Sequence, residues 1–533
     1  MQEDQVHLVP PTPKPPPPPQ PPEFIGTRHV LAFMGFLGFA NVYAMRVNLS
    51  VAIVAMVNNT AIPHVNSNSS NVCPASSTDN TTHHTEDGEF VWDENKQGLI
   101  LGSFFYGYVV SNLFGGRLGE VIGGKVVYGI GVLVTSVLTL FTPVVVRYST
   151  TLFIILRVIE GLGEGVTFPA MNSMMARWIP PLERSKTSGI VYAGAQFGTV
   201  VSLPISGLLC QSSFLGGWPS VFYIFGVLGI LWFVAWMLLV HNTPESHPRI
   251  SQEEKDYIHT TLNYQPGQAK ALPIPWRHIL TSMPFWAIFV VHICQNWGFY
   301  TLLTELPTYM KNILHFDIAD NSFMSALPYL LMWLLSIAFG QLADLLRSRG
   351  NLSTTNTRRL FNSIGHYGPM VCLVLVGYAG CNHVAAIVFL CGAVGLNGGT
   401  YAGYMNSHLD IAPNFAGTLM GITNSFATIP GFLAPLATGA LINGNETLSQ
   451  WRLVFWISSI VYLVGNTFYI IFVSGEEQHW NRPQNKYLGG VQSQYGTLDS
   501  SSAGTDGRNN EGGVVSQEQG GGPSQPTTIH EVF

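Results

Sequence analysis

Apolar residues fill long stretches of this chain without leaving a polar face for about twenty residues at a time. A helix needs about twenty such residues to cross the hydrocarbon core of a bilayer. Twelve stretches reach this length, beginning near residues 30, 97, 125, 152, 187, 218, 285, 321, 363, 384, 415 and 452. The pattern predicts an all-α membrane protein with twelve transmembrane helices.

The composition supports this class and excludes several others. Of the 533 residues 47% are hydrophobic and only 10% are charged, against about 25% charged in soluble domains. The net charge of -6 and the lack of any basic run longer than two residues give no support for nucleic-acid binding. No nucleophile elbow, zinc motif or phosphate loop is visible, so neither an enzyme nor a bound cofactor is expected.

The distribution of basic residues predicts the orientation. An even number of spans puts both termini on one side, and all but six of the 24 Lys and Arg residues fall on that side. The six exceptions are Lys96, Arg147, Lys311 and Arg452 outside, and Arg46 and Arg157 within spans. Because cytoplasmic loops carry the excess of Lys and Arg, both termini are expected to be cytoplasmic.

This topology divides the chain into five parts. In order they are a Pro-rich cytoplasmic tail 1–29, a first six-helix half 30–240 with a long outer loop 58–96, a cytoplasmic linker 241–280, a second six-helix half 281–474, and a Gly/Ser/Gln-rich tail 475–533. The tail composition is that of a disordered segment. In the linker, Ser251 followed by Glu254 has the spacing of a capping box and predicts a short helix.

The outer side is expected to carry glycans. The sequons on that side are headed by Asn58, Asn68, Asn80 and Asn445. Cys73, Cys210 and Cys381 fall on the same side, so a disulfide between Cys73 and Cys210 and free thiols are both open.

Both tails carry short interaction patterns. Pro10–Pro22 is nearly all proline, and such segments form polyproline II ligands for aromatic-groove domains or stiff spacers. Tyr495–Leu498 has the Tyr-x-x-hydrophobic pattern that sorting adaptors read on endolysosomal proteins.

Three charged residues interrupt the fourth span. Each ionised residue at a helix centre costs about 2.5 to 3.5 kcal/mol on translocon scales, so Arg157, Glu160 and Glu164 must face protein or water. At about 100° per residue all three lie on one helical face. A polar stripe on a spanning helix is typical of an ion or solute pathway.

The two glutamates are candidates for proton coupling. They lie one turn apart, so ionising both would set like charges close together in a low dielectric, which favours one of them holding a proton. Arg157 precedes Glu160 by three residues and can pair with it. Glu164 is then the expected proton carrier, with Glu160 as the alternative.

Cations and hydroxyls within the spans are candidates for substrate binding. Arg46 has no acid three or four residues away, so its partner is either an acid on another span or a substrate carboxylate, which a guanidinium binds with two parallel bonds. Arg157 is the second cation. Tyr106 and Tyr300 either face the cavity and bond an anion or serve packing.

A short motif occurs twice at equivalent positions. Gly116–Glu120 after the second span and Gly340–Asp344 after the eighth both read G-x-L-small-acid, 224 residues apart. Such a duplication is typical of transporters whose two six-helix halves rock about a central site. The segments are either ordinary turns or gates.

Their placement resembles the signature loop of the major facilitator superfamily. That resemblance implies a cytoplasmic latch formed by the acids and nearby basic residues, here Glu120, Lys125 and Asp344. By its own motif, Asp410 is assigned to the same cytoplasmic-end gate.

Four further stretches narrow the resemblance. They are Val42–Ser50, Gly102–Tyr108, Glu160–Ala170 and His408–Pro413, and they are similar to the family of sialin, the vesicular glutamate transporters and the type I sodium/phosphate cotransporters. The resemblance implies transport of organic anions, commonly coupled to protons, across lysosomal or vesicular membranes.

Two departures place the chain nearest the sialin branch. Leu101 and Asn296 stand where vesicular glutamate transporters carry a His and an Arg, and the loss of these cations suits a singly charged carboxylate. The expected function is proton-coupled export of sialic acid or a similar carboxylate by alternating access. The alternatives are a sodium-dependent phosphate cotransporter at the plasma membrane and, less favoured, an anion channel.

Overall fold

The fold is described from a computed structural model. It covers residues 26–58, 88–92, 94–262, 272–314, 318–442 and 447–482, and every structural statement below refers to these residues. Pro10–Pro22, Asn68, Asn80, Asn445 and Tyr495–Leu498 lie outside them. Within them all regular secondary structure is helical, apart from one isolated bridge between Val57 and Phe90.

The first half contains six spanning segments. They are α1 (Thr27–Met56), α2 (Glu94–Leu118), α3 (Gly124–Tyr148), α4 (Thr150–Gly165) continued by α5 (Thr167–Trp178), α6 (Arg184–Gln211) and α7 (Pro219–Leu239). A π-helical turn, η1 (Gly119–Gly123), joins α2 to α3, and η2 (Pro181–Glu183) precedes α6.

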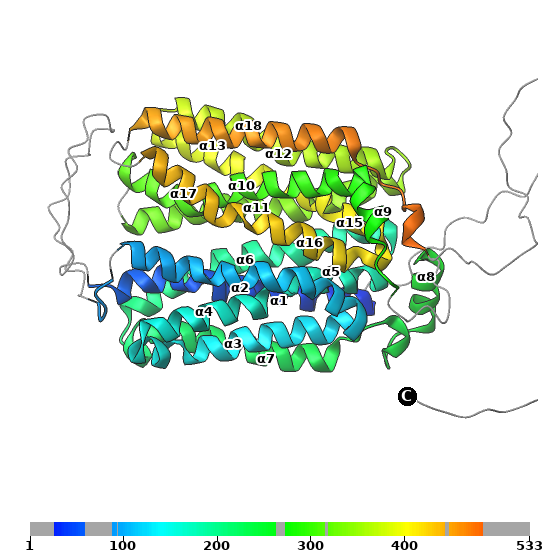
Figure 1. The fold of residues 1–533 in the computed structure, drawn as a ribbon, viewed down its shortest axis with the longest axis horizontal. Coiled ribbons are helices and arrows are strands. Elements are labelled where there is room, and N and C mark those ends of the chain that lie inside the picture. The colour runs from blue at the N-terminus through cyan, green and yellow to red at the C-terminus, as the bar shows by residue number, and fades with distance from the viewer. Residues whose placement is uncertain are drawn as a thin grey trace, which may run out of the picture. The chain divides into compact units, whose positions relative to one another are not determined.

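The second half repeats this plan. Its segments are α10 (Met283–Asn312), α11 (Ile318–Ser348), α12 (Thr354–Tyr378), α13 to α15 (His383–Leu396, Gly399–Ala402 and Tyr404–Ile411), α16 and α17 (Ala416–Thr428 and Pro430–Ile442) and α18 (Leu448–Phe472). Figure 1 shows these helices, green to orange, lying alongside those of the first half. The linker between the halves holds α8 (Gln252–Leu262) and α9 (Trp276–Thr281), and we call the end where these two lie the linker end.

The twelve expected crossings are present. By length and composition alone, nine segments qualify as candidate membrane spans, and one of them, Lys96–Tyr148, is long enough to include both α2 and α3. The α4–α5 pair, which carries the three charges, and α10 complete the set. The predicted all-α fold of two six-helix halves is confirmed.

Side-chain exposure distinguishes the outward face of a helix from the face packed against protein. In α7, Trp232 and Trp236 are buried at 5% and 0% exposure, whereas Leu231 and Leu238 on the other face are 60% and 73% exposed. A helix that is apolar on both its buried and its exposed face is suited to a bilayer.

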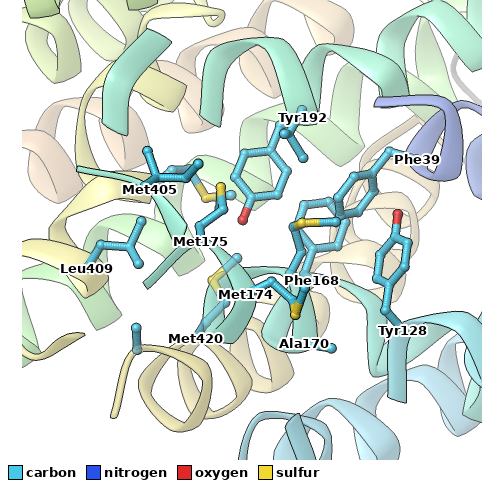
Figure 2. Close-up of a cluster of buried hydrophobic side chains, with 14 of the residues drawn as sticks. Phe39, Tyr128, Phe168, Ala170, Met174, Met175, Tyr192, Met405, Leu409 and Met420 are labelled. Atoms are coloured by element: carbon cyan, nitrogen blue, oxygen red, sulfur yellow. The ribbon is translucent and has the colours of Figure 1, made fainter. Parts of the chain in front are cut away.

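A buried cluster of aromatic and methionine side chains joins the two halves (Figure 2). Phe168 of α5 stacks on Tyr192 of α6 with ring centroids 5.3 Å apart, and Phe39 of α1 lies 4.6 Å from Phe168. From the second half, α15 and α16 contribute Met405 and Met420 to the same core. Methionine fills irregular gaps easily, which suits an interface between two bodies.

The linker helix α8 is fastened to the first half. As expected from the capping box, the Ser251 hydroxyl accepts from the Glu254 N–H at 3.2 Å. The Glu254 carboxylate, however, leaves its own helix and accepts from the N–H groups of Thr27 and Arg28 at 2.8 and 3.2 Å and from the Arg28 guanidinium at 2.9 Å. It thereby caps the start of α1.

Of the two alternatives left open for Cys210, the structure shows the free thiol. Cys210 is a free thiol, so the disulfide with Cys73 is absent, and Cys73 itself lies outside the described residues. Cys381, between α12 and α13, is disulfide-bonded. Of the four expected glycan acceptors only Asn58 is described; its N–H donates to the Phe90 carbonyl at 2.8 Å, just beyond α1.

Candidate functional site

A small cavity lies between the two halves. Its volume is about 50 Å³, enough for about three to five waters at about 10–15 Å³ each. Aromatic and uncharged polar side chains line it, namely Tyr43, Tyr108, Phe168, His292, Gln295, Asn296, Phe299, Tyr300, Met332, Asn397, Thr400, Tyr401, Tyr404, Met405 and Asn424. A second cavity of about 20 Å³ shares Tyr43 and Phe299 with it and is lined by Arg46.

Arg46 pairs with Glu164 across helices α1 and α4. The Arg46 Nε donates to Glu164 Oε1 at 2.6 Å, and a terminal nitrogen of the guanidinium contacts the same oxygen. The cation also lies over the rings of Tyr43 and Tyr108, with 4.4 and 4.7 Å to the centroids. Of the two alternatives for Arg46, the structure therefore shows the acid on another span.

Arg157 pairs with Glu160, as the sequence predicted. Their side chains meet at 2.6 Å, and the other oxygen of Glu160 accepts from the Thr139 hydroxyl at 3.1 Å. The pair is 5% and 1% exposed and lines neither cavity. Phe104 lies between the two cations, about 5 Å from each.

The second carboxylate oxygen of Glu164 is left without a partner. Glu164 is 0% exposed, and its Oε2 is fully buried with no hydrogen-bond partner among the described residues. Buried polar atoms in native proteins are nearly always bonded, so such an atom calls for an explanation. A proton on Oε2 would need no rearrangement of the existing contacts.

The expected role of Tyr106 is wrong. Tyr106 is 54% exposed on the outer face of α2 and does not line the cavity. Its neighbour Tyr108, about 200° further around the helix, is 2% exposed and does line it. Tyr300 of α10 lines the cavity as expected, with its ring edge against Phe105.

The second half presents uncharged polar groups to the cavity. Gln295 of α10 and Asn397 exchange two side-chain hydrogen bonds, of 2.5 and 3.2 Å. Asn296 donates to the backbone of Ala427 at 2.7 Å. The charged groups thus come from the first half, and all the amide groups that line the larger cavity come from the second.

Helix breaks occur beside the cavity in both halves. α4 ends at Gly165, directly after Glu164, because Pro169 has no N–H to donate to the Gly165 carbonyl. In the tenth crossing, Asn397 ends α13 and Gly403 separates α14 from α15. Transporter sites are commonly built on such discontinuous helices.

The first copy of the repeated motif contacts the second half at the linker end. Glu120 of η1 accepts from both the N–H and the hydroxyl of Thr418, at 2.7 Å each. Thr418 lies in the first turn of α16, and the N-cap residue Phe415 offers no side-chain cap of its own. The acid therefore satisfies a helix N-terminus in the other half, where negative charge is favourable.

The second copy makes the equivalent contact with the two halves exchanged: its acid belongs to the second half and the helix N-terminus belongs to the first. Asp344 of α11 accepts from the N–H groups of Ser185 and Lys186 at 3.3 and 2.6 Å. Both belong to the first turn of α6, whose N-cap residue also has no side-chain bond. We call these two contacts, Glu120 with Thr418 and Asp344 with Ser185 and Lys186, the latches.

The motif glycines allow the latches to close. A Cβ at Gly340 would lie 2.5 Å from the Ser185 carbonyl, and a Cβ at Gly116 would collide with the carbonyl of Gly417. At both places the backbone of one half touches the backbone of the other, so glycine is required for the close approach.

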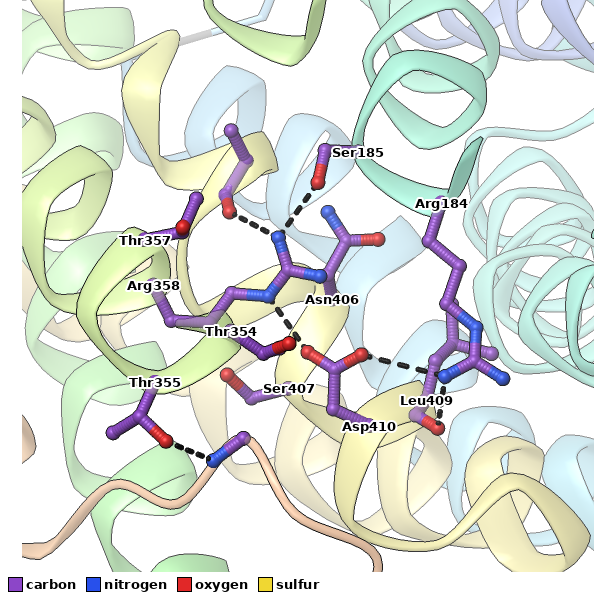
Figure 3. Close-up of polar contacts among 12 residues, drawn as sticks. Arg184, Ser185, Thr354, Thr355, Thr357, Arg358, Asn406, Ser407, Leu409 and Asp410 are labelled. Carbon is purple, nitrogen blue, oxygen red and sulfur yellow. Dashed lines mark hydrogen bonds and ion pairs between the residues drawn. The ribbon is translucent and has the colours of Figure 1, made fainter. Parts of the chain in front are cut away.

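A buried ion cluster stands beside the latches (Figure 3). Asp410 of α15 accepts from Arg358 of α12 at 2.7 Å and from Arg184 of the first half at 3.3 Å. Arg358 in turn donates to the Ser185 hydroxyl at 2.7 Å. Asp410 thus lies where its motif placed it, among contacts that cross between the halves.

The basic partner of Glu120 differs from the expected one. Arg117 contacts Glu120 at 3.3 Å and Arg177 donates to its backbone carbonyl at 2.8 Å. Lys125 takes part through its main chain, donating its N–H to Asn242 and accepting from Trp236. Among the described contacts Lys125 does not reach the second half.

Several site residues were not foreseen from the sequence. They are Tyr43, Arg184, Gln295, Arg358, Asn397 and Thr423. The uncharged polar residues among them sit inside spanning segments, and polarity within a span is the signal that pointed to Arg46.

The broken helices, the cavity and the duplicated latches define a secondary transporter of the major facilitator superfamily. The sequence profile of the Major Facilitator Superfamily matches residues 30–435. The proton:xylose symporter XylE, solved with 6-bromo-6-deoxy-D-glucose, superposes with a TM-score of 0.61 at 14% identity, covering 85% of this chain and 97% of that one.

Two sequence relatives narrow the assignment. Human sialin is 48% identical over 478 residues, which is 90% of this chain and 94% of sialin. A Drosophila melanogaster protein that carries an inorganic phosphate cotransporter name is 46% identical over 463 residues, covering 86% and 87%. The chain belongs to the family of sialin, the vesicular glutamate transporters and the phosphate cotransporters, and it is a transporter rather than an enzyme.

Proposed function

We propose that the protein is a proton-coupled transporter that exports sialic acid or a similar singly charged carboxylate from a lysosome or vesicle. The observation that carries the proposal is the Arg46–Glu164 pair. Arg46 already holds a carboxylate in a geometry that a substrate carboxylate can replace. Arg46 also lines the smaller cavity, so its guanidinium borders the space between the halves.

Competition for Arg46 supplies the coupling. While Glu164 is ionised it occupies the guanidinium, and its unpartnered Oε2 is the atom that takes up a proton. A neutral Glu164 releases Arg46, because the ion pair loses its negative partner. One proton and one anion then enter together, and the four buried charges of the two pairs stay balanced.

The second half supplies recognition beyond the charge. Gln295, Asn296 and Asn397 offer amide donors and acceptors on the cavity wall facing Tyr43. Amide and phenol groups suit the hydroxyls and amide of a sugar acid. The relation to human sialin supports this substrate class.

The latches indicate which conformational state of the transporter the structure represents. Both hold the linker end closed, and the excess of basic residues on that side supports a cytoplasmic location for it. The structure then represents the state closed to the cytoplasm. Opening requires Glu120 and Asp344 to leave the helix N-termini that they cap.

The test is uptake into proteoliposomes. We expect labelled sialic acid to accumulate under an inward proton gradient, by up to about tenfold per pH unit for one proton per anion. Glu164→Gln should abolish gradient-driven accumulation while keeping exchange of labelled for unlabelled substrate, because Arg46 is permanently released. Glu89→Gln, which removes a surface acid far from the pair, is the control. Gradient-driven accumulation by Glu164→Gln would contradict the proposal.

The alternative is a sodium-dependent phosphate cotransporter, favoured by the fly relative. Phosphate also binds guanidinium groups with two parallel bonds, so Arg46 fits either anion. This alternative predicts uptake of labelled phosphate that disappears when choline replaces sodium. It also predicts no uptake of sialic acid, and the two results together would support it over the first proposal. Saturable, gradient-dependent uptake of either solute excludes an anion channel.

A further inference from the structure

A chain of three polar side chains runs through the core of the second half. His292 of α10 and His408 of α15 are 2% and 0% exposed, and both contact the hydroxyl of Thr423 on α16. The His292 Nδ1 lies 3.1 Å from the Thr423 oxygen and the His408 Nε2 lies 2.9 Å from it. The other nitrogen of His408, Nδ1, lies 3.3 Å from the Met405 carbonyl.

The hydrogen atoms of this chain follow from the bonds. The Met405 carbonyl only accepts, so His408 carries a hydrogen on Nδ1, and in its neutral form Nε2 accepts. The Thr423 hydroxyl has one hydrogen and two acceptors near it, this Nε2 at 2.9 Å and the Met420 carbonyl of its own helix at 3.3 Å, and the shorter contact takes the hydrogen. It must then accept from His292, whose hydrogen is on Nδ1.

The remaining nitrogen of His292 is directed to the cavity. His292 lines the cavity, its Nδ1 is occupied by Thr423, and its Nε2 is not among the fully buried atoms that lack a partner. In the neutral state this Nε2 carries a lone pair. The chain therefore begins at a basic nitrogen in the cavity and ends at His408, two residues before Asp410.

We propose that His292, Thr423 and His408 form a second proton-binding site, separate from Glu164, that takes a proton from the cavity and holds it on His408. The proposal rests on the proposed function in one respect, the entry of the substrate anion into this cavity. Every bond in the chain exists in both protonation states.

The transfer balances as a relay of three hydrogens. A proton from the cavity binds His292 Nε2, the hydrogen on His292 Nδ1 passes to the Thr423 oxygen, and the hydroxyl hydrogen of Thr423 passes to His408 Nε2. His292 ends neutral with its hydrogen on Nε2, Thr423 again has one hydrogen, and His408 becomes a cation. The two hydrogen bonds keep their atoms and reverse their direction.

The relay changes what the cavity offers a substrate. His292 Nε2 is an acceptor before the transfer and a donor after it, so the loaded site suits an anionic oxygen. The class of ligand is an anion that brings one proton into the second half. At the far end, the new cation on His408 lies two residues before Asp410 and bonds Met405 and Thr423, while Arg184 and Arg358 continue to hold Asp410 between the halves.

Other ionisable groups surround the chain. Tyr404 lies 5.0 Å from His292, ring to ring, and His366 lies on the far side of Tyr404. Towards the linker end the charges facing His408 are those of Asp410 with its two arginines, and Tyr462 and Tyr469 of α18 complete the set. Asp410 is the nearest anion and favours the cation on His408.

The test counts protons taken up when substrate binds. Purified protein in weakly buffered detergent with a pH-indicator dye is titrated with sialic acid at pH 5 to 7. We expect Thr423→Val, which removes the hydroxyl at constant volume, to take up about one proton fewer than the wild type. Thr428→Val is the matched control, because that buried hydroxyl on α16 bonds only the Asn424 carbonyl of its own helix.

The outcomes separate this site from the proposed function. No proton uptake by the wild type would contradict both. Uptake that Glu164→Gln removes entirely and Thr423→Val leaves unchanged would overturn the second site alone. If the valine variant does not bind substrate, Thr423→Ser must restore the wild-type count and His292→Gln must lower it by one; failure of either overturns the proposal.

Discussion

Glu120→Gln is expected to open the linker end. The change keeps the size of the side chain and one acceptor oxygen, but it removes the charge that caps α16. In the wild type both carboxylate oxygens are used, one by the Thr418 N–H and one by its hydroxyl. The amide can replace only one of these bonds as an acceptor.

The size of the effect follows from these contacts. A hydrogen bond to a charged group contributes about 1.5–3 kcal/mol, and negative charge at a helix N-terminus about 0.3–1 kcal/mol. A loss of about 2–4 kcal/mol in the closed state shifts the equilibrium roughly 30- to 700-fold, at about 1.4 kcal/mol per tenfold. A closed-to-open ratio of about 99:1 would fall to about 3:1 or reverse.

The assay measures the distance between the halves. Spin labels at Asp256 on α8 and Ser348 at the end of α11 are both exposed at the linker end, and Glu254 fixes α8 to the first half. Pulsed dipolar spectroscopy should show a longer distance between the labels for Glu120→Gln. The fraction of molecules at this longer distance should rise as the closed-to-open ratio falls from about 99:1 to about 3:1 or below.

The control is Glu477→Gln at the same end. Glu477 hydrogen-bonds Asn481 and Arg482 within its own segment, and only its longer-range charge interaction with Arg184 reaches the first half. A distance distribution for Glu120→Gln that matches the wild type, or an equal shift for Glu477→Gln, would refute the assignment of the latch.

Two further predictions concern backbone contact and pH. Gly116→Ala should reduce exchange transport by at least tenfold, because its Cβ collides with the Gly417 carbonyl when the halves close, whereas Gly207→Ala, with open space around it, should not. Burial opposes the charge of Glu254, but the N–H groups that it caps outweigh this and lower its pKa below the usual 4.5. Its stabilisation is therefore complete above about pH 4.5 and lost as the pH falls through the lower folded value. Hydrogen exchange at the start of α1 should stay slow at pH 5 and become fast in Glu254→Gln.

Local spacing predicted the contacts within one helix. Arg157 and Glu160 are three residues apart, so a helix brings them together whatever surrounds it, and the pair is present. The crossings and the repeated motif were predictable for the same reason, because length, hydropathy and recurrence are properties of continuous segments.

Contacts between distant segments were not predictable from spacing. Arg46 and Glu164 are separated by 118 positions and Glu120 and Thr418 by 298, so the packing of whole helices decides them. Tyr106 shows the remaining difficulty. An aromatic residue in an apolar span is compatible with a lipid-facing position and with a cavity-facing position. The rotation of α2 about its own axis determines that Tyr108, and not Tyr106, is buried at the cavity.

The backbone contacts at Gly116 and Gly340 have a consequence for the diversity of this family. Where main chain meets main chain, the fit requires glycine at these two positions and no other particular side chain, and the acids that seal it bind peptide N–H groups common to every sequence. The contacts that close the linker end therefore do not depend on which residues line the cavity. Selection can exchange Leu101, Asn296 or the polar wall for a new solute without redesigning the machinery that moves it.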